Sequence, residues 1–216
     1  MSVVAIDGPA GAGKSTIARA LAQRLGYRYL DTGAMYRAVA LAALRQSVDA
    51  SDAEAVGRIA ESAAIDISDA KVMLDGTDVT DEIRTSAVTE AVACVAAQPA
   101  VRAAMLARQQ AEARKGDVVI EGRDIGSTVA PEAAVKIYLM ASLEERARRR
   151  VRQMGLPEND ASLRQTSGAI DARDNADSTR KASPLVKPPD AVEVDTTGLT
   201  VDEVVDKVAR IVKEQQ

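Results

Sequence analysis

The sequence predicts an α/β fold with a central sheet of five parallel strands, because short apolar runs alternate along the chain with segments of helical periodicity. Each run is four to six residues long, a length typical of buried strands. The chain has 216 residues, which suits a domain with a sizeable core and an insert. The predicted strands are 3–6, 27–30, 117–121, 135–140 and 191–194.

The loop after the first predicted strand has the spacing G-x-x-x-x-G-K-[ST], which is typical of a phosphate-binding loop. Its backbone N–H groups can converge on a polyphosphate, and the N-terminus of the following helix adds a positive partial charge. We expect Lys14 to reach the β- and γ-phosphates of a nucleotide and the Ser15 hydroxyl to bind Mg²⁺. The predicted ATP-binding residues are Gly8, Pro9, Ala10, Gly11, Ala12, Gly13, Lys14, Ser15 and Thr16.

Helices are predicted where apolar residues recur every three to four positions and capping residues mark the ends. The first, at 17–25, is stopped by Gly26. A helix of about sixteen residues is opened by Pro99 and stopped by Gly116. The other predicted helices are 34–46, 53–63, one that runs from a capping box at 142–145 to residue 154, and one that begins at 200–203.

Two stretches differ from this alternation and predict parts outside the core. After the helix at 53–63, residues 64–68 and 71–75 alternate at period two and lead into a turn, which predicts a small insert with its own strands. Residues 155–190 are rich in polar residues, Gly and Pro and predict a mobile cover. The expected division is a core of residues 1–50, 98–154 and 185–216, an insert at 51–97 and a lid at 155–184.

The composition limits the chemistry that is available to the protein. The chain has no His, so the usual general base at neutral pH and the commonest metal ligand are both absent. Cys94 is the only cysteine, which excludes an intramolecular disulfide and a thiolate zinc site, and its small apolar neighbours predict buried packing. Lys, Arg, carboxylates and a recruited metal remain, and phosphoryl transfer suits that set.

Charge and hydropathy limit the expected partners. The net charge of −4 does not favour nucleic acid, whose binding requires excess positive charge. No apolar run approaches the length of a membrane span, and the N-terminus does not resemble a signal peptide. We therefore expect a cytoplasmic protein with no membrane and no nucleic-acid partner.

Three further segments place arginines or carboxylates where a second substrate could bind. Arg37 belongs to the segment 31–37, which follows the end of a predicted strand, where ligands bind in open α/β sheets. The triplet 122–124, Gly-Arg-Asp, follows another strand. Each segment also has a plainer interpretation, as a surface arginine or an i,i+4 salt bridge. The third segment contains Arg173, Asp177 and Arg180, which share one face if it is helical.

Taken together, these motifs resemble those of the bacterial cytidylate kinases, and the resemblance covers almost the whole chain. Motifs this numerous and in this order are very specific. They are IDGPAGAGKST (6–16), LDTGAMYR (30–37), DEIRT (81–85), VAAQPAVR (95–102), EGRDIG (121–126), VKIYL (135–139), SLEERARRR (142–150) and ARDNADSTRKASPL (172–185).

The resemblance implies a P-loop kinase fold whose five-stranded parallel sheet is flanked by helices. ATP would occupy the phosphate-binding loop, and CMP would lie between the core, a small α+β insert that binds the nucleoside monophosphate, and a short helical lid. By position, the implied catalytic residues are Lys14, Arg37, Arg123 and Arg180, of which the three arginines hold the CMP phosphate and the transferred group. Thr32 and Tyr36 would line the CMP site, Arg102 and Asp124 would read the cytosine edge, and Arg173 and Asp177 would bind the ribose.

The activity expected from the resemblance is ATP + (d)CMP ⇌ ADP + (d)CDP, with Mg²⁺ and in a monomer. Two positions depart from relatives: Glu121 stands where an aspartate is also found, and Ala93 replaces a serine that contacts the base. The arginine-rich run at 146–152 is expected to be mostly helix surface, with one member beside ATP. Two alternatives stay open, namely a P-loop kinase for UMP or another metabolite and a non-enzymatic P-loop switch.

Overall fold

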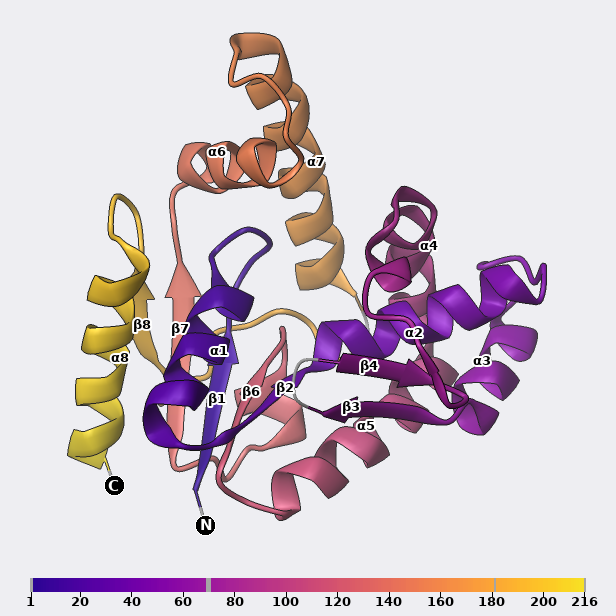
Figure 1. Cartoon of the computed structure of the whole chain (residues 1–216), viewed down its shortest axis with the longest axis horizontal. Helices are drawn as coiled ribbons and strands as arrows, with labels where there is room; N and C mark the ends of the chain where they lie inside the picture. The colour runs from indigo at the N-terminus through magenta and orange to yellow at the C-terminus, as the bar shows by residue number, and fades with distance from the viewer. Residues whose placement is uncertain (1, 69–70, 181, 216) are drawn as a thin grey trace.

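A computed structural model describes residues 2–68, 71–180 and 182–215 and contains the predicted five-stranded parallel sheet (Figure 1). The strands lie in the order β2-β6-β1-β7-β8, so β1 is central and all four neighbouring pairs are parallel. The carboxyl ends of parallel strands share one edge, where ligands bind in α/β proteins. The strands are β1 (Val3–Asp7), β2 (Arg28–Asp31), β6 (Val118–Glu121), β7 (Val135–Met140) and β8 (Val192–Asp195).

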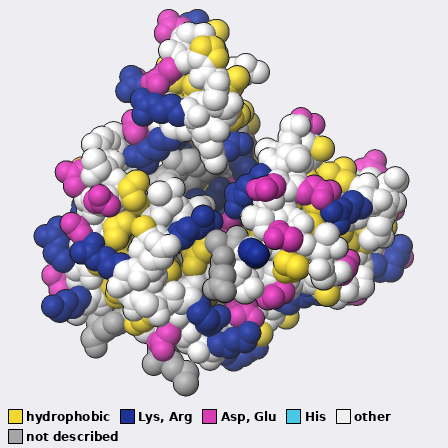
Figure 2. Space-filling view, in the orientation of Figure 1, with side chains coloured by type: hydrophobic (Ala, Val, Ile, Leu, Met, Phe, Trp, Pro, Cys, Tyr) yellow, Lys and Arg dark blue, Asp and Glu magenta, His cyan; other side chains and the backbone are white. Residues whose placement is uncertain are grey.

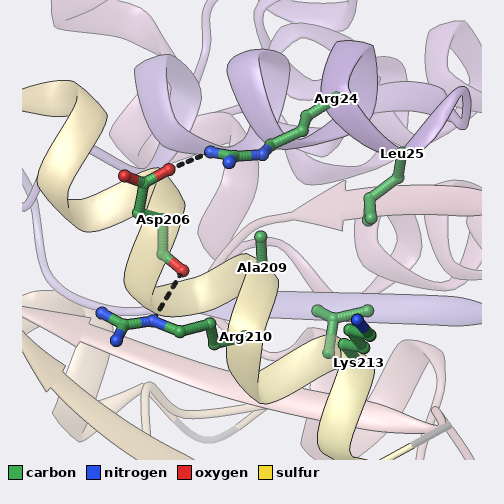
Figure 3. Close-up of a pocket in the computed structure, with 7 residues that line it drawn as sticks. Arg24, Leu25, Asp206, Ala209, Arg210 and Lys213 are labelled. Carbon is green, nitrogen blue, oxygen red and sulfur yellow. Dashed lines mark hydrogen bonds and ion pairs between the residues drawn. The ribbon is translucent and has the colours of Figure 1, made fainter.

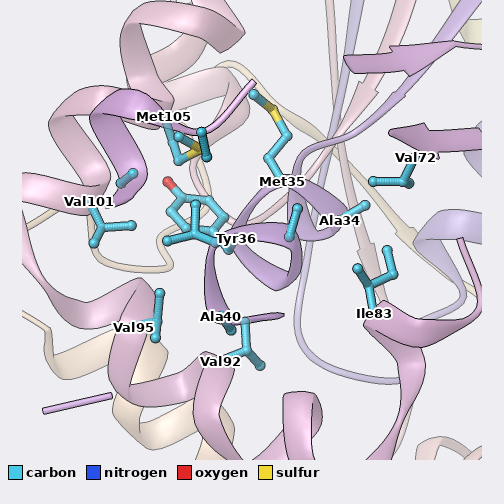
Figure 4. Packing of buried hydrophobic residues seen from close by; sticks show 14 of the residues in the cluster. Ala34, Met35, Tyr36, Ala40, Val72, Ile83, Val92, Val95, Val101 and Met105 are labelled. Carbon is cyan, nitrogen blue, oxygen red and sulfur yellow. The ribbon is translucent and has the colours of Figure 1, made fainter. Parts of the chain in front are cut away.

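Helices cover both faces of this sheet. Val4 and Ile6 of β1 pack in a cluster with α1 (Lys14–Leu25) and α8 (Val201–Gln215), whereas Ala5 packs in a second cluster on the other face. That second cluster contains α2 (Thr32–Arg45), α5 (Pro99–Arg114) and the π-helical turn η2 (Ile125–Val129). Figure 4 shows the ring of Tyr36 packed among apolar side chains that include Val101 and Met105 of α5.

The segment expected to form an insert contains a second, antiparallel sheet in the order β3-β4-β5. Its buried side chains belong to the same hydrophobic cluster as α2, so it packs directly onto the core. The sequence predicted two of its strands but not β5 or the helix α4, because β5 is only two residues long and α4 has no side-chain cap. The elements are α3 (Ala53–Ser62), β3 (Ile65–Ser68), β4 (Lys71–Leu74), β5 (Thr77–Asp78), η1 (Glu82–Arg84) and α4 (Ser86–Ala97).

Two helices, α6 (Leu143–Gln153) and α7 (Asp160–Thr179), stand above the carboxyl edge of the sheet (Figure 1). Most of the polar cover expected at 155–190 is therefore one helix of twenty residues. Asn159 caps it by accepting the Ser162 N–H, and Ile170 is buried. A single apolar contact of this kind is easily overlooked in a polar sequence.

Cys94 is exposed on α4, so the prediction that it would be buried is wrong. The buried stripe of α4 is Val88, Val92 and Val95, and Cys94 lies off that stripe. Its thiol donates to the carbonyl of Ala50 at 3.2 Å. Small neighbours in sequence therefore did not indicate which face of the helix is covered.

The helices of the described residues were also compared with the length and hydropathy of a membrane span. None of them satisfies both on its own. The pair α4 and α5 does so only when taken together, and its axis bends by 92° at the break.

Candidate active site

The phosphate-binding loop curls around its own lysine. Lys14 is buried, and its Nζ donates to the carbonyls of Gly8 and Pro9 at 2.8 Å each. Gly8 has φ +147°, and a Cβ there would lie 2.0 Å from the carbonyl oxygen of Leu139, so only glycine fits. Burial lowers the pKa of Lys14 to about 7, with Arg123 as the next cause. A bound polyphosphate would reverse that effect, because its negative charge favours the ammonium form.

Two arginines of α6 lie against the phosphate-binding loop. Arg146 donates to the carbonyl of Ala10 at 3.0 Å and pairs with Asp174 of α7. Asp174 in turn accepts the N–H of Ala10 at 2.9 Å. Arg149 donates to the hydroxyl of Thr196 at 2.9 Å and also lies beside the loop. Within the run 146–152, Arg146 and Arg149 are therefore the arginines that lie against the phosphate-binding loop or bond to Thr196 beside it. Sequence periodicity did not distinguish them from the other arginines of the run.

A buried carboxylate lies below the start of α1. Glu121 ends β6, is 3% exposed, and accepts a hydrogen bond from the hydroxyl of Tyr29 at 2.7 Å. Burial raises the pKa of Glu121, Asp31 raises it further, and Lys14 lowers it. Ser15 also interacts with this carboxyl group and lowers its pKa. Within the parts of the chain that the structure describes, no group of three or more His, Cys, Asp or Glu side chains could hold a metal by itself.

Across the sheet edge from the loop, Asp124 lies between two guanidinium groups. Its Oδ2 accepts from Arg102 of α5 at 2.5 Å, and its Oδ1 lies 3.5 Å from Nη2 of Arg180. Asp124 and Arg102 are 7% and 6% exposed, so water screens this pair weakly. Among the described residues, Arg102 Nε and Arg180 Nη2 are buried donors without a hydrogen-bond acceptor.

A second carboxylate, Asp177 of α7, joins the turn at 122–124 to the end of that helix. It accepts from Nε of Arg123 at 3.0 Å and from Nη1 of Arg180 at 3.3 Å. Arg180 is the C-cap of α7 rather than a helical residue. The expectation that three residues share one helix face therefore holds for Arg173 and Asp177 only. Burial lowers the pKa of Arg173, and Arg123 lowers it further.

Arg37 connects α2 to the insert. Its Nη1 donates to the hydroxyl of Thr89 at 3.0 Å and to the carbonyl of Ile83 at 3.2 Å. Burial lowers the pKa of Arg37 to about 10, and the like charges of Arg173 and Arg84 lower it further. Guanidinium groups that destabilise one another in this way are typical of a site that receives an anion.

The remaining predicted residues lie at the same edge in supporting positions. Thr32 begins α2, and its hydroxyl donates to the carbonyl of Glu121 at 2.7 Å. The Arg102 guanidinium lies over the ring of Tyr36, 5.5 Å from its centroid. Ala93 is exposed on α4. At the carboxyl edge of the sheet, the structure therefore has Lys14 in the loop after β1 and Asp124, with Arg102 and Arg180 against its carboxylate, after β6.

The surface view agrees with this arrangement. Lys and Arg side chains lie on both sides of the hollow between the α6/α7 part and the α2/α4 part of the molecule (Figure 2). A groove of about 640 Å³ lies elsewhere, between α1 and α8, and the residues drawn in Figure 3 include the Arg24–Asp206 ion pair. None of the predicted site residues lines that groove, so its size is no guide to the chemistry.

The family model and the curated relatives that match this sequence agree with one another. Residues 4–214 match the family model described as cytidylate kinase. A cytidylate kinase of Limosilactobacillus reuteri is 49% identical over 99% of this chain and 96% of its own length. A cytidylate kinase of Geobacillus kaustophilus is 49% identical over 98% and 96%, and one of Symbiobacterium thermophilum is 48% identical over 96% and 94%.

Solved structures with low sequence identity share the fold. An uncharacterised protein of Eubacterium ventriosum is 9% identical, with a TM-score of 0.56 and 99% of both chains covered. A gluconokinase of Sinorhizobium meliloti is 14% identical, with a TM-score of 0.50 over 99% of this chain and 92% of its own. These likenesses support the predicted α/β architecture.

Proposed function

The chain belongs to the cytidylate kinase family, and on that premise we propose that it transfers the γ-phosphoryl group of ATP to CMP or dCMP, giving ADP and CDP or dCDP. Family membership makes it a nucleoside monophosphate kinase. The observation that carries the choice of acceptor is the buried carboxylate of Asp124, flanked by Arg102 and Arg180.

Asp124 and Arg102 form a pair that fits cytosine better than uracil. A carboxylate oxygen has lone pairs to spare after accepting one bond, so Asp124 can also accept from the cytosine N4 amine. Arg102 has a free buried donor, Nε, that suits the N3 or O2 acceptors. Uracil would present its O4 acceptor to the carboxylate and its N3–H to the guanidinium, and mispaired buried polar groups cost several kcal/mol.

The transferred phosphoryl group would lie between the donor loop and the arginines. Lys14 would move from the loop carbonyls to the β- and γ-phosphates, and Arg37, Arg123 and Arg180 would hold the acceptor phosphate and the group in transit. The acceptor is already an anion, so the reaction needs no strong base and no histidine. Arg173 and Asp177 would bind the ribose, and the bonds of Asp177 to Arg123 and Arg180 support this role.

Mg²⁺ fits the donor set that the chain offers. Magnesium in kinases is held largely by substrate phosphates, with one or two protein oxygens completing the octahedron. The Ser15 hydroxyl and the Glu121 carboxylate interact at the start of α1 and would supply such oxygens. When bound with ATP, the ion would neutralise charge on the phosphates during transfer.

The proposal extends to the parts around the site. Residues 51–97 would close on the monophosphate and residues 155–184 would act as the lid, excluding water as the competing acceptor. Contacts of both parts with candidate site residues support this, since Thr89 bonds to Arg37 and Asp177 bonds to Arg123. The protein would work as a cytoplasmic monomer without a nucleic-acid partner.

A panel of acceptors tests this function. With ATP and Mg²⁺, ADP formation should depend on CMP or dCMP, with kcat/KM at least about tenfold lower for UMP and little activity on AMP or GMP, because mispairing costs more than about 1.4 kcal/mol. Equal use of UMP would favour a kinase for another monophosphate. No ADP formation with any acceptor would favour a non-enzymatic P-loop protein.

A further inference from the structure

One buried carboxylate, Asp7, is not used by the proposed chemistry. It is the last residue of β1, the central strand in Figure 1, and directly precedes Gly8 of the phosphate-binding loop; it is 2% exposed. Its two oxygens accept different backbone hydrogens: Oδ1 accepts from Ile125 N–H and Oδ2 from Gly126 N–H, both at 2.8 Å. A buried group that uses both oxygens on the backbone of one distant turn has a specific partner.

That turn is the segment that presents the candidate base-reading residue. Ile125 and Gly126 begin the π-helical turn η2, whose first N–H groups have no acceptors within the helix itself. Asp124 directly precedes them, and Arg123 directly precedes Asp124. The turn is tightly packed, since a Cβ at Gly122 would lie 2.6 Å from the Ile125 side chain. Fixing two N–H groups therefore fixes where the side chains of 123 and 124 leave the backbone.

We propose that Asp7 is a positioning residue that holds the base-reading turn at 122–126 in register with the phosphate-binding loop. It acts through the N–H groups of Ile125 and Gly126 and touches neither substrate. The proposal rests on the proposed function, because it assumes that Asp124 meets the base of the acceptor. It predicts that loss of the Asp7 carboxylate impairs acceptor recognition more than ATP binding.

Only a carboxylate can accept hydrogen bonds from both backbone N–H groups, those of Ile125 and Gly126, at this position. An ionised carboxyl group is an acceptor at both oxygens, whereas an amide accepts at one atom and donates at the other. In Asp7→Asn, the amide nitrogen would face one of the two backbone N–H groups, donor against donor. Burial raises the pKa of Asp7 to about 6, and Asp124 raises it while the two N–H bonds and Lys14 lower it, so the group is ionised in assays at pH 8.

The test compares Asp7→Asn with the parent at pH 8. We expect KM for CMP to rise about tenfold, KM for ATP to change less than twofold, and the CMP/UMP ratio of kcat/KM to fall. The matched control is Val208→Ala, a buried change in α8 on the other face of the sheet, which lowers stability without touching the turn. It should leave all three quantities within twofold of the parent.

The outcomes separate this proposal from the proposed function. A parent that does not prefer CMP overturns the function itself. If the parent prefers CMP but Asp7→Asn raises the KM for CMP and the KM for ATP equally, or raises neither, the role of Asp7 alone is overturned. The role is also overturned if Val208→Ala raises the KM for CMP more than the KM for ATP. If Asp7→Asn does not fold, amide hydrogen exchange in the parent decides. Slow exchange at Ile125 and Gly126 that CMP slows further than an ATP analogue supports the role, and unprotected amides contradict it.

Discussion

Replacing Lys14 with Ala should lower kcat by roughly 10²–10³-fold, because one preorganised donor to the transferring phosphoryl group is lost, at a cost of about 3–4 kcal/mol. The change should be larger in kcat than in the KM for CMP, since Lys14 lies in the phosphate-binding loop, where ATP and not CMP is proposed to bind. Steady-state ADP formation with saturating CMP measures it. A variant that keeps more than half of the parent kcat would contradict the assignment.

Two controls make this result interpretable. Lys14 donates to the carbonyls of Gly8 and Pro9, so the variant must be shown to keep its fold by circular dichroism and by its Tm. Lys115→Ala removes an exposed lysine at the end of α5 that pairs only with Glu112 among the ion pairs of the described chain, and it should retain the parent kcat.

Arg180→Lys should lower kcat/KM for CMP by roughly 30–100-fold although the charge is conserved, corresponding to about 2–3 kcal/mol for lost charged hydrogen bonds. The three nitrogens of the Arg180 guanidinium face three different partners, namely the Ser183 carbonyl at 2.6 Å, Asp177 and Asp124. An ammonium is a single point charge and cannot face all three while also reaching a phosphate.

The matched control for this variant is Arg164→Lys, an exposed arginine on the same helix, α7. It should change kcat/KM for CMP less than twofold. If Arg180→Lys behaved like Arg164→Lys, then Arg180 would be a structural cap of α7 and its place among the catalytic residues would be lost.

Local chemistry made the core strands and the glycine-rich loop at 8–16, with the helix that follows it, predictable from the sequence. The glycines and Lys14 define the phosphate-binding loop within nine residues, and the apolar runs are short enough to be assigned as strands one at a time. The side-by-side order of those strands is a long-range property, so the sequence pattern alone did not place Glu121 beside Ser15. Two residues 106 positions apart meet there because β6 lies next to β1.

The unpredicted parts depend on contacts that leave no local signal. The sequence did not predict a role for Asp7, because its partners, Ile125 and Gly126, contribute only backbone N–H groups. Asp174 was not predicted because its partner, the backbone N–H of Ala10, lies 164 positions away in the sequence. Cys94 was wrongly predicted to be buried because composition does not reveal which side of α4 faces the core.

The most direct test of the account is the CMP/UMP ratio of kcat/KM in the parent and in Asp124→Asn, with the fold of the variant checked first because Arg102 and Arg180 lose a buried counter-charge. We expect a parent ratio above about ten and a variant ratio several-fold smaller, because an amide can rotate to offer either a donor or an acceptor to the base. An unchanged ratio in a folded variant would show that Asp124 does not read the base, and the acceptor site would have to be assigned elsewhere.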